Sequence, residues 1–289
     1  MATPHAAQAG QTPRPTVKAS GMKPDIATAA GIVLALAGIL GGLILEKGQI
    51  QDIVQGTAAM IVLGGTFGAV LITNPLPVVL RAFGGLSKVF MERASPTTDT
   101  IEALIQYAAK ARKNGIVSLE AEAAAIADPF LRKALGLAVD GTDLQEIRKM
   151  METDIVLAEQ GIESEAKVWE AAGGYAPTVG IIGAVLGLIQ VMKHLEDIKE
   201  VGHGIAVAFV ATVYGVGTAN ILFLPMANKI RARMRAASLL QEMTLEGVVG
   251  IVEGLNPTLI RLKLTSYDDQ PPPKGKTGKS GGAKPASAA

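Results

Sequence analysis

The amino-acid sequence predicts an all-α membrane protein with four transmembrane helices and a helical cytoplasmic domain between spans 2 and 3. The first observation is composition, since 49% of the residues are hydrophobic and only 18% are charged. The second is a set of four apolar runs without charged residues. At about 1.5 Å per helical residue, each run can cross a hydrocarbon core of roughly 30 Å. The third is the stretch 81–170, which has a helical pattern but no such run.

The positions of these runs divide the chain into six parts. We expect a disordered N-terminal tail (1–21), a transmembrane hairpin of spans 1 and 2 (22–80), a cytoplasmic helical domain (81–170), a transmembrane hairpin of spans 3 and 4 (171–228), a cytoplasmic C-terminal helix (229–265) and a disordered tail (266–289). Residues 1–21 lack the apolar segment of a cleavable signal, so the first apolar run is interpreted as a true span.

Spans 1 and 2 are Ile26–Leu45 and a run from Gly56 past Ile72. Each contains two glycines four residues apart, which lie on one face of a helix and allow close packing in a membrane. These pairs are Gly38 with Gly42 and Gly64 with Gly68.

Capping and turn residues predict four helices in the cytoplasmic domain. The predicted signals are Thr98 and Asp99 as the start of the first helix with Gly115 as its end, Ser118 as a cap for the second, Asp128–Pro129 for the third and Thr142-x-x-Gln145 for the fourth. The fourth helix is expected to be long and to continue into span 3 near Gly173 and Gly174.

Spans 3 and 4 are the uncharged runs Ala171–Met192 and Gly204–Asn228. The loop between them, 193–203, is short, so the two spans must form an antiparallel hairpin. Four basic residues then open an amphipathic helix that is expected to reach about Leu255: Lys229, Arg231, Arg233 and Arg235. Lysines and arginines beside the spans predict that both termini and the 81–170 domain are cytoplasmic.

Composition and motifs exclude several functions. The net charge is only +1, which gives no electrostatic case for nucleic-acid binding. The chain has no cysteine, so disulfides and thiolate metal sites are excluded. Its histidines, His5, His194 and His203, are scattered, and the Gly-rich segment GGTFG lies within span 2. No metal, cofactor or enzymatic activity is predicted.

None of the four spans contains Asp, Glu, Lys, Arg or His. Proteins that move protons keep an ionisable group in the membrane, so a carboxylate would have to come from another subunit. The polar side chains in spans 3 and 4 can bond water or a partner but cannot titrate near neutral pH. They are Thr178, Gln190, Thr212, Tyr214, Thr218 and Asn220.

Each candidate residue also has a structural interpretation. A membrane threonine such as Thr212 commonly bonds back to its own helix. Transmembrane helices tolerate prolines such as Pro177 and Pro225. The charged residues in the middle domain form an ordinary solvated face in this interpretation: Arg112, Lys113, Glu120 and Glu122.

The segments APTVGIIGAVLGLI and AVAFVATVYGVGTANILFLPMANKI resemble spans 3 and 4 of the MotA family, the ion-channel subunit of the bacterial flagellar stator within the MotA/TolQ/ExbB superfamily. VLGGTFGAVLI in span 2 and ARKNGIVSLEAE in the middle domain resemble that family as well. The resemblance covers most of residues 22–265 in order. It implies an inner-membrane, multi-pass subunit that conducts protons together with a MotB-like partner and converts the flux into torque.

The resemblance also implies residue roles. Pro177 and Pro225 match prolines linked to conformational change, and Thr212, near Tyr214, matches a threonine of the ion pathway. Arg112 and Glu120, with neighbouring Lys113 and Glu122, match the charged surface that meets the rotor protein FliG. A pentamer around a dimer of a single-span partner with an in-membrane Asp is implied in the same way.

The coupling ion is predicted from two departures. Sodium-driven members carry threonines where Ala184 and Ala211 stand. A dehydrated sodium ion needs several oxygen ligands, so we expect H⁺ to be the coupling ion and Ala184→Thr not to abolish function.

Two alternatives stay open at this point. An ExbB- or TolQ-like proton-channel subunit would energise outer-membrane processes, but the first hairpin and the 81–170 insertion argue against it. A non-conducting membrane scaffold would bind partners through its cytoplasmic helices, and Thr212→Ala would leave its function intact.

Overall fold

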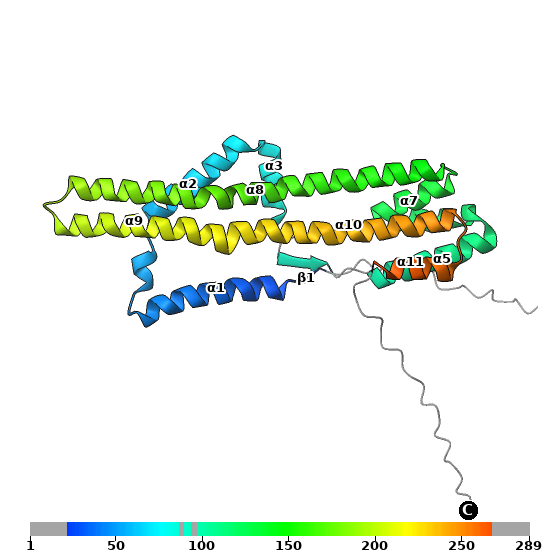
Figure 1. Ribbon diagram of the computed structural model, residues 1–289, viewed down its shortest axis with the longest axis horizontal. Coiled ribbons are helices and arrows are strands. Elements are labelled where there is room, and N and C mark those ends of the chain that lie inside the picture. The colour runs from blue at the N-terminus through cyan, green and yellow to red at the C-terminus, as the bar shows by residue number, and fades with distance from the viewer. Residues whose placement is uncertain (1–21, 87–89, 94–96, 268–289) are drawn as a thin grey trace, which may run out of the picture.

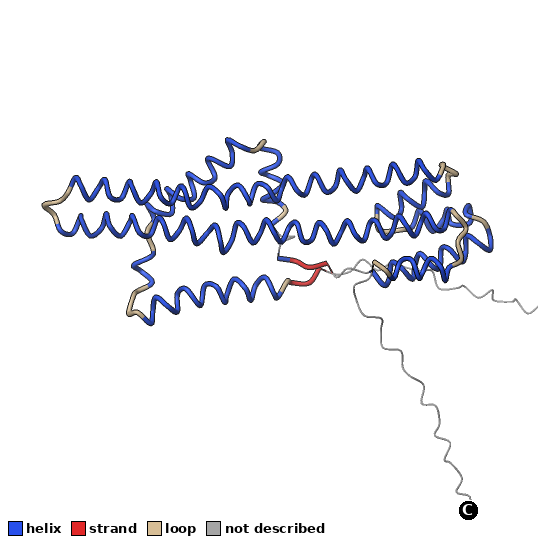
Figure 2. The backbone as a smooth tube through the Cα atoms, in the orientation of Figure 1, coloured by secondary structure: helices blue, strands red, loops and turns tan. Residues whose placement is uncertain are grey.

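The structure is a computed structural model that describes residues 22–86, 90–93 and 97–267. The predicted tails, 1–21 and most of 266–289, lie outside the described residues. The described chain is almost entirely helical (Figure 2). Its elements are β1 (Met22–Pro24), α1 (Ile26–Leu45), the 3-10 helix η1 (Ile50–Ile53), α2 (Gly56–Thr73), α3 (Leu76–Gly84), β2 (Met91–Arg93), α5 (Thr97–Asn114), the 3-10 helix η2 (Ile116–Leu119), α6 (Glu120–Ala125), α7 (Pro129–Val139), α8 (Leu144–Lys193), α9 (Ile198–Thr218), the π-helical turn η3 (Ala219–Phe223), α10 (Leu224–Val252) and α11 (Pro257–Thr265).

Two very long helices form the axis of the molecule (Figure 1). One is α8, with 50 residues, and the other is the continuous helix α9–η3–α10, with 55 residues from Ile198 to Val252. At about 1.5 Å per residue each is roughly 75–80 Å long, far more than a bilayer needs. Each therefore has a membrane half and a half that enters the helical domain.

Four helices are long and apolar enough to cross a membrane: Ile26–Leu45, Ile50–Thr73, Leu144–Lys193 and Ile198–Val252. This confirms the predicted all-α membrane fold with four spans. The prediction that a cytoplasmic helix continues into span 3 is also confirmed, because α8 is unbroken through Gly173 and Gly174.

Glycines bring the two long helices into backbone contact in their membrane halves. A Cβ atom on Gly180 would lie 2.9 Å from the Ala211 carbonyl oxygen, and one on Gly215 would lie 2.5 Å from the Ala176 carbonyl oxygen. A Cβ on Gly187 would lie 2.8 Å from the Ala208 nitrogen. Only glycine permits this close packing of α8 on α9.

The helical domain has its own apolar core. It is built from α5, α7 and α11 around the cytoplasmic ends of α8 and α10. Fully buried side chains at its centre include Leu104, Leu135, Met151, Met243 and Leu264. Because Met151 and Met243 belong to the two long helices, the core joins the domain rigidly to spans 3 and 4.

A second cluster packs α2 and α3 against the long helices, between the contact glycines and the helical domain. Trp169 of α8 packs edge-on against Phe83 of α3, with ring centroids 4.9 Å apart. Phe67 of α2 lies 5.8 Å from Phe223 of η3, again centroid to centroid. Such tilted aromatic pairs contribute beyond the area that they bury.

Several predicted element boundaries were wrong in detail. Ser118 does not cap a helix, because it lies inside η2 and its hydroxyl donates to the Gly115 carbonyl oxygen. The cap of α8 is Asp143 and not Thr142, since the Asp143 carboxylate accepts from the Gln145 N–H at 2.9 Å. The loop between spans 3 and 4 is shorter than predicted, because Asp197 caps α9 one residue before Ile198.

The strands are a small addition that the sequence did not predict. Met22–Pro24 pairs antiparallel with Met91–Arg93, with Met22 opposite Arg93. The pair ties the segment before α1 to the segment after α3 (Figure 2).

Candidate functional site

The residues predicted to line an ion pathway lie along the contact between α8 and α9. Ala211 is fully buried, and a Cβ on Gly183, next to Ala184, would lie 2.8 Å from its methyl group. Thr212 lies opposite Gly180, where a Cβ would be 3.5 Å from the Thr212 Cα. The structure therefore brings Ala184, Ala211 and Thr212 to the same level of the hairpin.

Within this single chain the Thr212 hydroxyl bonds its own helix. It donates to the Ala208 carbonyl oxygen at 3.2 Å, four residues earlier. A hydroxyl that donates in this way still has lone pairs that can accept a hydrogen bond. The Thr212 hydroxyl can therefore bond its own helix and still offer a polar group to an ion pathway. Its role in ion passage stays a prediction.

The Tyr214 hydroxyl bonds a different part of the chain, whereas Thr212 bonds its own helix. The Tyr214 hydroxyl donates to the Ile53 carbonyl oxygen at 2.6 Å and accepts from the Gln55 N–H at 3.3 Å. Both partners are backbone atoms at the junction of η1 and α2. The phenol is therefore committed to holding the first hairpin against span 4.

Three other polar side chains of spans 3 and 4 also bond backbone within their own helix. Thr218 donates to the Tyr214 carbonyl oxygen at 2.7 Å, and Asn220 donates to the Val216 carbonyl oxygen at 2.9 Å. Thr178 donates to the Tyr175 carbonyl oxygen at 2.8 Å. The described residues contain no group of three or more His, Cys, Asp or Glu that could hold a metal ion.

The two prolines lie at neighbouring levels of the paired helices. Pro177 is inside α8, and Pro225 is the second residue of α10, directly after η3. Gly173, one turn before Pro177, contacts Leu224, since a Cβ on Gly173 would lie 2.6 Å from a Leu224 methyl carbon. A proline removes one backbone donor from each helix, so both helices have a weak point close to this contact.

The π-helical turn η3 was missed by the sequence analysis. Its five residues, Ala219–Phe223, end two residues before Pro225. The Pro225 ring cannot donate to the preceding turn, and a wider turn accommodates the loss. Pro225 was the only sequence signal for this π-helical turn. A proline in a long apolar run is equally compatible with a simple kink, so the turn was not predicted.

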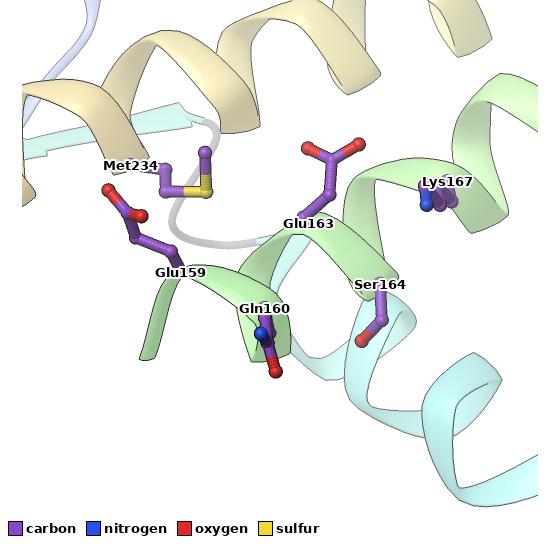
Figure 3. A pocket seen from close by; sticks show the side chains of 6 residues that line it. All are labelled: Glu159, Gln160, Glu163, Ser164, Lys167 and Met234. Atoms are coloured by element: carbon purple, nitrogen blue, oxygen red, sulfur yellow. The ribbon is translucent and has the colours of Figure 1, made fainter. Parts of the chain in front are cut away.

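Ion pairs hold the long helices together just beyond the membrane halves. The Arg231 guanidinium of α10 bonds the Glu163 carboxylate at 2.8 and 3.0 Å and the Glu170 carboxylate at 2.5 and 3.2 Å. These hydrogen bonds raise the pKa of Arg231 and lower the pKa values of Glu163 and Glu170. Glu163 also lines an open pocket on α8 with five other residues, Glu159, Gln160, Ser164, Lys167 and Met234 (Figure 3).

A further ion-pair cluster lies before span 1. Asp25 is only 5% exposed, and its carboxylate lies 2.5 Å from Lys229 Nζ and 2.8 Å from an Arg233 nitrogen. The hydrogen bonds from Lys229, from the Thr28 N–H and from Arg233 hold the pKa of Asp25 well below its usual range. Three of the four basic residues after span 4 are thus ion-paired, which their sequence pattern did not reveal.

The predicted charged surface forms the end of the helical domain. Gly115, with φ +81°, turns the chain from α5 into η2 and α6. Arg112 and Lys113 are exposed at the end of α5, and Glu120 is exposed at the start of α6. Glu122 does not share this exposure, because it is half-buried and paired with Lys110.

Comparison with known proteins gives consistent matches along the chain. Residues 122–243 match the model of the MotA/TolQ/ExbB proton channel family, and residues 29–115 match the model for the motility protein A N-terminal region. Motility protein A of Bacillus subtilis is 33% identical over 84% of this chain and 90% of its own length. Motility protein A of Helicobacter pylori is 35% identical over 84% of this chain and 95% of its own length.

Solved structures agree with the sequence matches. The structure of C. jejuni MotAB has a TM-score of 0.81 and 32% identity, covering 86% of this chain and 98% of that chain. The flagellar MotAB stator complex from Bacillus subtilis has a TM-score of 0.79 and 34% identity, covering 84% of this chain and 96% of that chain.

Proposed function

Because this chain belongs to the MotA/TolQ/ExbB proton channel family, we propose that it is a stator subunit of the bacterial flagellar motor. It works in the inner membrane as a multi-pass protein in an oligomer with a MotB-like partner. The observation that carries this function is the match to motility protein A along both hairpins and the helical domain. An ExbB- or TolQ-like role is not favoured, because the match at 29–115 includes the first hairpin.

We infer that the carboxylate that binds the ion comes from the partner. The spans of this chain contain no Asp, Glu, Lys, Arg or His, and the hydroxyls of spans 3 and 4 cannot titrate near neutral pH. A single-span partner with an in-membrane Asp, ringed by several copies of this chain, satisfies that need. A pentamer is the arrangement that the family resemblance implies.

H⁺ is the coupling ion that the residues favour. Ala184 and Ala211 offer methyl groups where a dehydrated sodium ion would need oxygen ligands. A proton requires only the partner's carboxylate and a chain of water molecules, with Thr212 as one polar group beside it.

The two long helices give a route from ion passage to torque. Protonation of the partner's Asp removes a charge next to the α8–α9 contact. The packing between the partner's span and these two helices then changes. Pro177, Pro225 and η3 let the long helices bend at that level. Because α8 and α10 run without a break into the core of the helical domain, a change of tilt moves the whole domain.

Membrane orientation follows from the same arrangement. Both termini and the helical domain are proposed to be cytoplasmic, with the 193–203 loop outside. The basic residues beside the spans support this orientation.

The function is tested in a strain that lacks only this gene. We expect cells that build normal filaments but do not rotate them, and rotation should return when the wild-type gene is supplied on a plasmid. Swimming speed of the complemented strain should not depend on external sodium and should fall when a protonophore removes the proton gradient. A deletion strain that swims normally and has no second stator set would refute the function. Speed that follows sodium would refute proton coupling alone.

The exposed charges at the end of the helical domain are proposed to contact the rotor protein FliG. Exposed charges of both signs steer and orient a partner even where each pair adds only about 0.2–1 kcal/mol. Reversal of both charges, Arg112→Glu with Glu120→Lys, is therefore expected to reduce swimming strongly without lowering the protein level. Lys149→Glu makes a matched charge reversal on exposed α8 and should leave swimming unchanged. Equal swimming in the two strains would remove these residues from the rotor contact.

A further inference from the structure

The first span is attached to the rest of the described chain at its ends and not along its length. None of the 20 residues of α1 is buried. Figure 1 shows α1 lying apart from α9 and α10. Among the described residues, α1 does not pack extensively against either long helix. The position of α1 relative to the long helices therefore depends on what holds its two ends.

The inner attachment is the Asp25 ion-pair cluster, here called the inner tether and defined as Asp25 with Lys229 and Arg233. Its distances are those of charge-assisted hydrogen bonds. Backbone bonds add to it, since the Asp25 N–H donates to the Phe90 carbonyl oxygen at 2.8 Å and Arg233 donates to the Met91 carbonyl oxygen. The Asp25 carboxylate also caps α1 by accepting from the Thr28 N–H at 3.1 Å.

The outer attachment is the Tyr214 phenol, here called the outer tether. It bonds the backbone at Ile53 and Gln55, the first segment after the turn that follows α1. The Tyr214 ring packs against a small cluster that includes Ala58 and Val62 of α2. The bonds of the hydroxyl are thus separate from the packing of the ring.

Both tethers end on the same continuous helix. Tyr214 lies before η3, and Lys229 and Arg233 lie after Pro225, so the π-helical turn and the proline fall between the two attachment points. A change of bend at η3 would alter the distance between the tethers. A regular helix such as α1 resists compression and extension because its backbone hydrogen bonds fix its rise.

We propose that Asp25 and Tyr214 are positioning residues that make α1 a brace across the bend of span 4. Because α1 joins the two tethers in series, each tether can carry force only while the bonds of the other are formed. The brace limits how far the bend at η3 and Pro225 can open, and so keeps bending within the range that tilts the helical domain. The effect on torque rests on the stator function, whereas the coupling of the two tethers does not.

Conservative variants separate the tethers from other roles of these residues. Asp25→Asn removes the charge but keeps an oxygen that can cap α1. Tyr214→Phe removes only the hydroxyl and keeps the ring in its cluster. Asp25→Glu keeps the charge and serves as the rescuing variant. Asp128→Asn is the matched control, because Asp128 caps α7 by accepting from the Leu131 N–H at 2.8 Å and has no ion pair among the described contacts.

The test is a double-mutant cycle in cells that lack the native gene. Stall torque per stator is measured with beads on filament stubs, together with the protein level and co-purification of the partner. Loss of the charge-assisted bonds of Asp25 shifts a local equilibrium by about tenfold or more, and loss of the neutral Tyr214 bonds shifts it by about two- to tenfold. Each single variant is therefore expected to lower torque at an unchanged protein level, with the larger loss in Asp25→Asn. The double variant should lose about as much torque as the more affected single variant, because the two tethers act in series through α1. Asp25→Glu and Asp128→Asn should retain torque.

Three outcomes would overturn the brace. Additive torque losses in the double variant would show that the residues act independently. Full torque in both single variants would show that neither tether matters. A lower protein level in Asp25→Asn, absent in Asp128→Asn, would assign Asp25 to folding alone. Thermal unfolding of the purified complex provides the same cycle without flagella. If the shifts in melting temperature are non-additive, the two tethers are coupled and the brace is supported. If the strain without this gene swims normally at the same time, only the stator function is refuted.

Discussion

Gly215→Val is expected to abolish motility. The Gly215 Cα lies where α9 crosses α8, and a Cβ there would stand 2.5 Å from the Ala176 carbonyl oxygen and 3.1 Å from the Gly180 Cα. These are backbone atoms in the middle of a long helix, so no side chain can move aside to make room. Overpacking of this kind typically costs about 1–3 kcal/mol, and more where backbone cannot move, and it forces the two helices apart. Any ion pathway along the α8–α9 contact would lose its geometry.

The measurement is swimming and stall torque, with membrane extracts probed for the protein and its partner. Gly217→Val is the matched control on the same helix, since a Cβ at Gly217 has no heavy atom within 4 Å. It should retain most of the wild-type torque if it faces lipid. Normal torque in Gly215→Val would mean that α8 and α9 are not in contact at this level in the working stator.

Trp169→Ala is expected to destabilise the stator by about 3–5 kcal/mol, the usual cost of removing a large buried aromatic side chain. Trp169 is 2% exposed, packs edge-on against Phe83 of α3 and stacks on Phe223 of η3. Its loss leaves a cavity where α2, α3, α8 and η3 meet, and this cluster holds α2 and α3 against the long helices. Thermal unfolding of the purified complex should show a marked drop in melting temperature, and motility should be lost at elevated growth temperature first.

Trp169→Phe is the control for this prediction. The Trp169 indole nitrogen is buried and has no hydrogen-bond partner among the described residues. Phenylalanine therefore removes no hydrogen bond and preserves part of the aromatic packing, so its effect should be much smaller. Equal destabilisation by Phe and Ala would show that the cluster depends on the full indole and not on buried aromatic area.

The spans were predictable from the sequence because membrane length and apolarity are strong constraints. Ile26–Leu45 is both the predicted span 1 and the observed α1, and α2 begins at the predicted Gly56. Asp128 followed by Pro129 marked the start of α7 correctly, since the geometry of a cap is local. Local signals were not always sufficient, since Ser118 and Thr142 are equally local and neither caps a helix.

Features that depend on long-range partners were not predictable. Lys229, Arg231 and Arg233 were interpreted only as a basic flank, because Asp25, Glu163 and Glu170 lie at least 61 residues away. The partner of the Tyr214 hydroxyl is likewise backbone at Ile53. The assignments of Thr212 to ion passage and of Pro177 and Pro225 to conformational coupling stay predictions, since they concern a complex of which this chain is one part.

The π-helical turn has an angular consequence for everything that follows it. Each residue advances an α-helix by about 100°, so one residue accommodated in η3 rotates the phase of α10 by roughly that angle relative to α9. The phase decides which side chains face α8: Arg231 points to Glu163 and Glu170 on one side, and Arg233 points to Asp25 on another. A deletion of a single residue within Ala219–Phe223 would convert the π-helical turn to regular α-helix and turn these cations away from their carboxylates. The length of that short segment therefore sets the rotational alignment between the membrane half and the cytoplasmic half of the stator.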